Sequence, residues 1–213
     1  MGTRVGLIDY GMGNLFSVEK AFWRLQKPLK LVRSPNDLFD CDALILPGVG
    51  SFDPALERLK ETKLIPHLET WNKENKPLLG ICLGLQLLFE SSDEGEISGL
   101  SFIKGHVRKL PINEGERIPH MGWSILIPKK SCPLIKYKEK DNWVYFVHSY
   151  AAIPSEIKDL AASTSFGKSE LSAIIWKGRL GACQFHPEKS GAVGQRMLGN
   201  WLKWIDNGGI FIK

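Results

Sequence analysis

The stretch Pro77-Leu78-Leu79-Gly80-Ile81-Cys82-Leu83-Gly84-Leu85-Gln86-Leu87-Leu88-Phe89-Glu90 decides the fold. Its first part is a short apolar run after a proline, which predicts a buried strand, and its second part has the apolar spacing of a helix. Between them lies Gly80-x-Cys82-x-Gly84, the strand–turn–helix pattern of a nucleophile elbow with cysteine in place of serine. So sharp a turn strains the backbone of the nucleophile and leaves room only for glycine on either side of it.

This turn would point Sγ of Cys82 at a helix N-terminus, where the helix dipole and free N–H groups favour a thiolate. The N–H of the next residue, Leu83, is placed to donate to an oxyanion. An inert core cysteine in a strand–helix connection would leave the same pattern, because cysteine is often buried. A second motif has to separate these two interpretations.

That motif is Gly181-Ala182-Cys183-Gln184-Phe185-His186-Pro187-Glu188. A nucleophilic cysteine needs a base, and the base needs a group that orients it. His186 and Glu188 supply both after a strand-like run, and Pro187 biases His186 to an extended backbone that carries both side chains toward the same side. We therefore expect Cys82, His186 and Glu188 to form a catalytic triad.

Short apolar runs and amphipathic segments alternate along the first half of the chain. The runs 4–9, 29–33 and 43–46 read as buried strands, and the helical patterns fall at 15–25, 54–59 and 64–72, ahead of the elbow. This alternation predicts an α/β fold with an open, largely parallel, twisted sheet flanked by helices, of the flavodoxin or Rossmann type.

The second half has a different texture. Strand-like runs at 103–110, 118–127, 144–147, 161–166 and 173–177 predict added antiparallel strands beside the first sheet. A last helix follows, and its inward face would carry Val193, Met197, Leu198, Trp201 and Ile205. We expect residues 1–213 to form a single domain.

Charge and cysteine usage exclude several function classes. The net charge is +5, but the lysine clusters have interleaved acidic residues and form no basic helical face. They are typical of a solvated surface, so we expect neither nucleic acid nor a membrane as a partner. Gly11-x-Gly13 lacks the third glycine of a dinucleotide site, because Phe16 stands there. No spacing suggests a metal, so none is expected.

The four cysteines suggest a reducing compartment. Cys41 and Cys183 lie at or within apolar runs and are expected in the core, whereas Cys132 lies in a polar loop and is expected to be an exposed thiol. No leader pattern or long apolar run is apparent, which favours a cytoplasmic protein.

Several stretches together carry a family resemblance. They are PLLGICLGLQLLFE (77–90), GACQFHPEKSG (181–191), DYGMGNL (9–15), LPGVGSF (46–52), PHMGW (119–123) and YFVHSY (145–150). In this order they resemble the class I glutamine amidotransferases with a catalytic triad, and among these the glutaminase subunits of imidazole glycerol phosphate synthase. Ser124 departs from the pattern, because that family usually has asparagine there.

The resemblance implies hydrolysis of L-glutamine to glutamate and ammonia through a thioester on Cys82, without a cofactor. Cys82, His186 and Glu188 would be catalytic. The oxyanion would be held by Leu83 and, in the Pro47-Gly48-Val49-Gly50 loop, by Val49. The residues implied in holding the substrate are Gly50, Gln86, His148, Ser149 and Tyr150.

The ammonia should be used on another chain, because a single glutaminase domain leaves no residues for a second site. The resemblance implies a heterodimer with a TIM-barrel cyclase subunit, which makes imidazole glycerol phosphate and aminoimidazole-carboxamide ribonucleotide in histidine biosynthesis. The implied interface residues are Asn14, Pro119, Met121, Trp123, Tyr145 and Lys189.

Two alternatives stay open at this point. A paralogous glutaminase could supply ammonia to a sugar-modifying synthase, and sequence motifs separate it poorly from the histidine-pathway subunit. A catalytically silent subunit could merely organise its partner, against which the intact triad argues. A cysteine peptidase of the same fold is disfavoured by Gln86 and the Pro47–Gly50 loop, which resemble glutaminase features.

Overall fold

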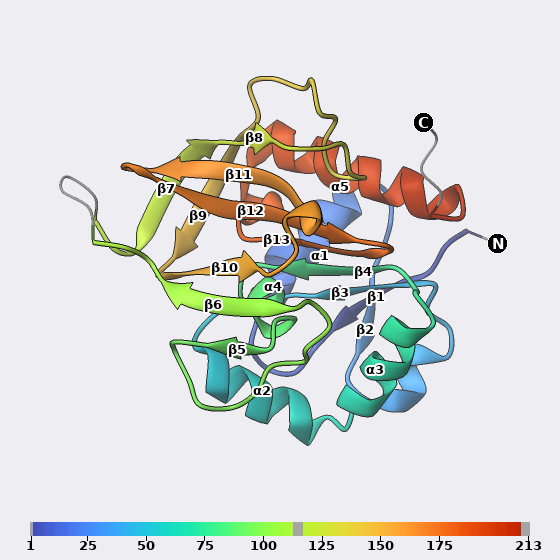
Figure 1. Cartoon of the computed structure of the whole chain (residues 1–213). Helices are drawn as coiled ribbons and strands as arrows, with labels where there is room; N and C mark the ends of the chain where they lie inside the picture. Colours follow the sequence, from blue (N-terminus) through green and yellow to red (C-terminus); the bar gives the residue numbers. More distant parts are fainter. Residues whose placement is uncertain (1, 113–116, 210–213) are drawn as a thin grey trace.

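An eight-stranded sheet runs through the centre of the computed structural model, which describes residues 2–112 and 117–209 (Figure 1). The strand order is β2 (Lys30–Val32), β1 (Val5–Ile8), β3 (Ala43–Leu46), β4 (Leu78–Ile81), β13 (Leu180–Cys183), β12 (Ser169–Lys177), β11 (Leu160–Phe166), β8 (Ile127–Pro128). The strands from β2 to β13 pair in parallel, and those from β13 to β8 pair antiparallel. The predicted parallel α/β sheet with added antiparallel strands is confirmed.

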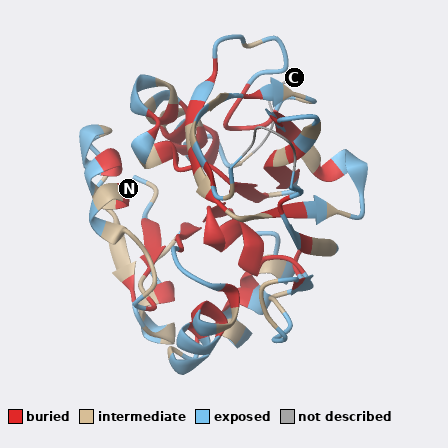
Figure 2. Ribbon diagram, turned by 90° about the vertical axis from the view of Figure 1, so that its left-hand side faces the viewer, coloured by how far each residue is buried: buried red, intermediate tan, exposed pale blue. Residues whose placement is uncertain are grey.

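Helices cover both faces of this sheet because its buried strands send alternate side chains to opposite sides. Leu7, Ile45 and Leu79 pack against one helix layer, formed by α1 (Leu15–Arg24) and α5 (Gly191–Asp206). Ile8 and Leu44 pack against the other, formed by α2 (Phe52–Glu61), α3 (Ile65–Lys73) and α4 (Leu83–Leu87). Figure 2 shows the buried residues along the strands and inner helix faces.

Two small sheets extend the molecule beside the main one. One has the order β10 (Tyr150–Pro154), β6 (Gly105–Lys109), β5 (Ser91–Ser92), and the other pairs β7 (His120–Ile125) with β9 (Trp143–His148). The single strand expected at 118–127 is two strands, because β7 pairs with β9 whereas β8 joins the edge of the main sheet. Short 3₁₀ helices η1 (Pro35–Leu38), η2 (Ile157–Asp159) and η3 (Pro187–Lys189) complete the fold.

The expectation of an exposed thiol at Cys132 is wrong. Its side chain is buried with Leu134 and Ile135 in the core on the α5 side, and Cys132 forms an isolated β-bridge with Ile135. The short apolar run folds inward although charged residues flank it on both sides. Burial raises the pKa of the Cys132 thiol to about 11, so it is unreactive at neutral pH.

No described helix has both the length and the apolar character needed to span a bilayer.

The elbow between β4 and α4 depends on close backbone contacts. Cys82 has φ 55 and ψ −111, a conformation that costs about 1–3 kcal/mol for a residue with a side chain. A Cβ on Gly84 would overlap the carbonyl oxygen of Leu46, and a Cβ on Gly80 would lie 2.9 Å from the carbonyl oxygen of Gly84. The predicted steric need for both glycines is therefore confirmed.

Replacing Gly84→Ala should lower the free energy of unfolding by about 1–3 kcal/mol or more, because β3 and α4 must move apart. Gly199→Ala is the matched control. Gly199 lies inside α5 and an added Cβ would meet only Leu25 at 3.5 Å, so this variant should gain about 0.5–1 kcal/mol. Denaturant unfolding of the two variants checks this; equal changes in both would contradict the account of the elbow.

Candidate active site

The pairing of β4 with β13 brings the predicted triad together. Ile81 lies opposite Cys183, and the N–H of Cys82 donates to the carbonyl of Cys183 at 2.8 Å. Because both strands run in the same direction, the residues that follow them emerge at one edge of the sheet. Cys82 and His186 therefore meet there, although they are far apart in the sequence.

His186 is oriented by Glu188. The His186 backbone is extended, with φ −99 and ψ 95, and its Nδ1 lies 2.7 Å from Oε1 of Glu188. Both side chains are almost fully buried. The ion pair holds Nδ1 on the carboxylate, so that Nε2 is the ring atom left for the thiol.

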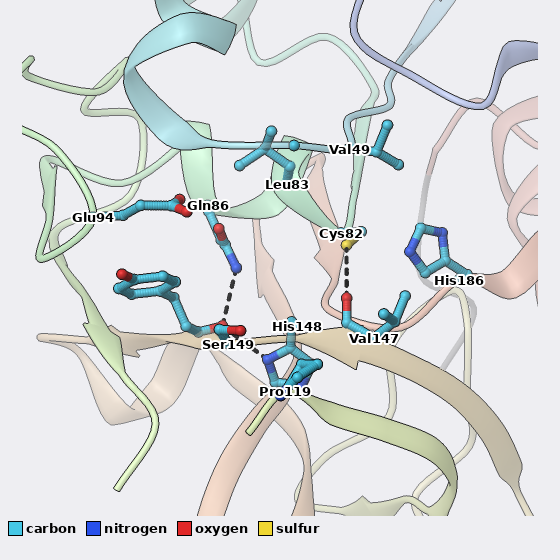
Figure 3. A pocket seen from close by; sticks show the side chains of 12 residues that line it. Val49, Cys82, Leu83, Gln86, Glu94, Pro119, Val147, His148, Ser149 and His186 are labelled. Atoms are coloured by element: carbon cyan, nitrogen blue, oxygen red, sulfur yellow. Dashed lines mark hydrogen bonds between the residues drawn. The ribbon is translucent and has the colours of Figure 1, made fainter. Parts of the chain in front are cut away.

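The thiol and the imidazole do not yet share a hydrogen bond. Sγ of Cys82 contacts the carbonyl of Val147 at 3.9 Å, and Nε2 of His186 has no hydrogen-bond partner among the described residues (Figure 3). Burial lowers the pKa of His186, but the adjacent Cys82 and Glu188 side chains raise it by more, to about 10. An imidazolium beside a thiol favours the thiolate, so His186 can both hold and return the proton.

A pocket of about 310 Å³ opens beside the thiol. It is lined by Val49, Gly50, Cys82, Leu83, Gln86, Glu94, Pro119, Val147, His148, Ser149, Tyr150 and His186. The structure thus gathers every residue that the sequence suggested for catalysis, oxyanion binding or substrate binding, except Glu188, which lies behind His186.

The Pro47–Gly50 loop lies directly on the elbow. A Cβ on Gly48 would come within 2.9 Å of Cβ of Leu83, and Tyr10 fixes the loop by donating from its hydroxyl to the carbonyl of Pro47 at 2.8 Å. Gly50 has φ +103, which favours glycine. Val49 and Leu83 therefore border the same pocket, as an oxyanion site would need. The supporting role of Tyr10 had no signal in the sequence.

One wall of the pocket, formed by Gln86, His148 and Tyr150, is built around the carbonyl of Tyr150. It accepts from Nε2 of Gln86 at 3.0 Å and from Nδ1 of His148 at 2.8 Å. Gln86 is buried, so its amide faces the interior and not the solvent. Burial lowers the pKa of His148 to about 3, although the hydrogen bond to Tyr150 opposes this, and the imidazole is neutral at pH 7.

Glu94 is a pocket residue that sequence reasoning missed. Its Oε2 accepts from the N–H of Phe52 at 3.0 Å, and burial raises the pKa of its carboxyl group. It lies among Asp93, Gly95 and Glu96, so the sequence offered only an acidic run of the kind found in solvated loops. As a carboxylate it can pair with a cationic group of a ligand.

Three of the residues suggested for a partner interface, Met121, Trp123 and Tyr145, lie on the paired strands β7 and β9. Trp123 is opposite Tyr145, with ring centroids 6.1 Å apart, and Met121 is opposite Val147. Met121 and Trp123 are 61% and 53% exposed, so an apolar face is left uncovered. Lys189 is exposed on η3.

Pro119 and Asn14, which were also suggested for the interface, have contacts of their own within the chain. Pro119 is exposed and also lines the pocket, so it lies where a partner and the pocket would meet. Asn14 caps α1, because its side chain accepts from the N–H of Ser17 at 3.3 Å. Capping alone is enough to explain this asparagine.

Comparisons with known proteins identify the family of the chain. The glutamine amidotransferase class-I family profile matches residues 6–204. The chain is 63% identical to the imidazole glycerol phosphate synthase subunit HisH 2 of Prochlorococcus marinus strain MIT 9313, over 98% of each chain. It is 62% identical to subunit HisH of strain MIT 9211, over 96% of each chain.

Solved structures share the fold at lower identity. The structure of PurLQS from Thermotoga maritima aligns with a TM-score of 0.76 and 19% identity, covering 96% of this chain and 100% of that chain. The glutaminase domain of Trypanosoma brucei CTPS with bound acivicin aligns with a TM-score of 0.66 and 19% identity, covering 99% and 96%.

The buried neutral His148 makes stability depend on pH. Because its folded pKa of about 3 is below the ordinary 6.5, its contribution is present above pH 6.5 and is lost as the pH falls toward 3. The His148 contribution to the free energy of unfolding should fall by about 1 kcal/mol for each pH unit between 6.5 and about 5. His186 adds only a small slope of the opposite sign there, because a raised pKa contributes stability that is nearly complete once the pH is below 6.5.

Denaturant unfolding at pH 6.5 and about pH 5 measures this slope, and the His148→Gln variant should show a smaller one. Equal slopes in the two proteins would contradict the burial of a neutral histidine here.

Proposed function

The chain belongs to the class-I glutamine amidotransferase family, and from this we propose that it is the glutaminase subunit of an imidazole glycerol phosphate synthase. The observation that carries the proposal is the placement of Cys82, hydrogen-bonded His186–Glu188 and an open pocket at one sheet edge. The identity of 63% to a HisH relative over nearly the whole chain supports the choice of synthase. We take residues 1–213 as one glutaminase domain in the cytoplasm, a location that the four free thiols favour.

The reacting form is an ion pair of the Cys82 thiolate and the His186 imidazolium, whose raised pKa of about 10 keeps the proton on the ring, and it forms as Sγ of Cys82 turns from the carbonyl of Val147 toward Nε2 of His186. The thiolate attacks the side-chain carbonyl carbon of glutamine. The oxyanion forms beside the N–H of Leu83 and the peptide of Val49. The imidazolium protonates the leaving nitrogen, ammonia departs and a thioester remains. His186 then deprotonates water, whose attack releases glutamate and restores the thiol.

Substrate binding follows from the groups left over in the pocket. Nε2 of Gln86 is used by the protein, so its Oε1 can accept from the carboxamide of glutamine. The Glu94 carboxylate can bind the α-ammonium group. Gly50, Ser149 and Tyr150 border the same space and complete the proposed binding wall, with His148 behind them.

The proposed partner is a TIM-barrel cyclase subunit that uses the ammonia. Ammonia released to solvent would be protonated and diluted, so the acceptor site should lie over the pocket. The apolar face of β7 and β9 continues to the pocket mouth through Pro119 and Val147, which line the pocket. Exposed Met121 and Trp123 are residue types found at interface hot spots, and Lys189 and Asn14 would lie at the rim.

The substitution Cys82→Ala should abolish glutamine-dependent synthesis by the two-subunit enzyme and leave ammonia-dependent synthesis, because the thiol acts only in ammonia release. Cys41→Ala, which removes a half-buried thiol outside the pocket, should leave both. Product formation with each nitrogen source measures the two rates. Equal loss of both rates in Cys82→Ala would contradict the assigned role, and loss of neither would favour a catalytically silent subunit.

The substitution Trp123→Ala should weaken binding of the cyclase subunit by about 2 kcal/mol, which is roughly thirtyfold in Kd. Phe39→Ala is the matched control. Phe39 is also an exposed aromatic residue, at 85% exposure, but it borders a groove together with residues of α3. Figure 1 shows α3 far from β7 and β9. Calorimetric titration measures both constants. A Trp123→Ala protein that binds as tightly as the Phe39→Ala protein would remove β7 from the interface.

A further inference from the structure

Gln184 is a buried polar residue that the proposed mechanism leaves unused. It follows β13 directly and its side chain is fully buried. Because Ile81 lies opposite Cys183, the next residue on each strand places Gln184 beside Cys82. Its Nε2 lies 3.9 Å from Sγ of Cys82.

The hydrogen-bond network determines which way this amide points. The carbonyl of Tyr150 can only accept, so the NH₂ group of Gln86 must face it. The same Nε2 donates its second hydrogen to Oε1 of Gln184 at 3.1 Å. Oε1 of Gln184 therefore faces Gln86, and its N–H donors face the sulfur.

The Tyr150 carbonyl is in turn held by a histidine pair. Nδ1 of His148 donates to it, so Nε2 of His148 accepts from Nδ1 of His120 at 3.1 Å. Nε2 of His120 then accepts from the hydroxyl of Ser124 at 2.9 Å. A continuous chain of hydrogen bonds thus runs from β7, next to the exposed Trp123, to the nucleophile.

Packing does not require an amide at this place. A buried amide needs hydrogen-bond partners, and methionine would fill a similar volume without that requirement. A hydrogen bond to the charged form of a group favours that form, so an N–H directed at Sγ favours the thiolate over the thiol. The two faces of the sulfur would then be held by Gln184 and by His186.

We propose that Gln184 is a positioning residue for Cys82: its side-chain N–H holds the thiolate in the orientation for attack, and the chain from Ser124 to Gln86 fixes the direction of its amide. The inference rests on the proposed glutaminase function for the role of Cys82. Its test reads the thiol itself, so it can fail while glutamine hydrolysis stands.

The test compares the pH dependence of alkylation of Cys82 by iodoacetamide in the full chain and in Gln184→Met, with the modified cysteine identified by peptide mass. In the variant the midpoint of the profile should move up by about one pH unit, which makes alkylation roughly tenfold slower at pH values below both midpoints. Gln195→Met is the matched control, because Gln195 donates to the carbonyl of Ala21 away from the pocket, and its profile should be unchanged.

A second measurement and a replacement variant keep the test decisive. Glutamine hydrolysis with the partner subunit present should show a lower kcat for Gln184→Met, with the KM changed less than the kcat. If Gln184→Met does not fold, Gln184→Asn takes its place, because its shorter amide withdraws the donor from sulfur and should move the profile the same way. A folded variant with the alkylation profile of the unaltered chain would overturn the proposal.

Discussion

The register between β4 and β13 is the constraint on which the active site depends. With Ile81 opposite Cys183, the two strands end side by side, and Cys82, Gln184 and His186 arrive at one edge of the sheet. A shift of one residue would turn every side chain of β13 to the other face. Both strands are buried on both faces, which fixes the register through packing in two separate cores.

Strand β9 contacts the segments that carry Cys82 and His186 and also forms part of the apolar face of β7 and β9. Its Tyr145 carbonyl accepts from the N–H of His186 at 2.9 Å, and its Tyr145 N–H donates to Oγ of Ser190 at 3.0 Å. Two residues further on, the Val147 carbonyl contacts Sγ of Cys82. The outward side chains of the same strand lie in the apolar face that we propose for the partner, so that face and the triad share one backbone.

The sequence predicted the parts that depend on local pattern. Apolar runs buried on both faces identified the parallel strands, and Gly80-x-Cys82-x-Gly84 identified the elbow, because its steric demand is local. Cys132 was misjudged since charged neighbours hid a short apolar run. Glu94, Tyr10 and Gln184 were missed because their partners come from distant segments, and pairing across the fold leaves no spacing that a sequence pattern can show.

We propose that the arrangement at the sheet edge makes Cys82 the group that attacks glutamine. This proposal is tested most directly by incubating the two-subunit enzyme with a glutamine analogue that carries a diazoketone in place of the carboxamide, and then locating the covalent adduct by peptide mass spectrometry. The account predicts one adduct, on Cys82, and none when excess glutamine protects the pocket. An adduct on Cys41, Cys132 or Cys183, or labelling of Cys82 that glutamine does not prevent, would contradict it.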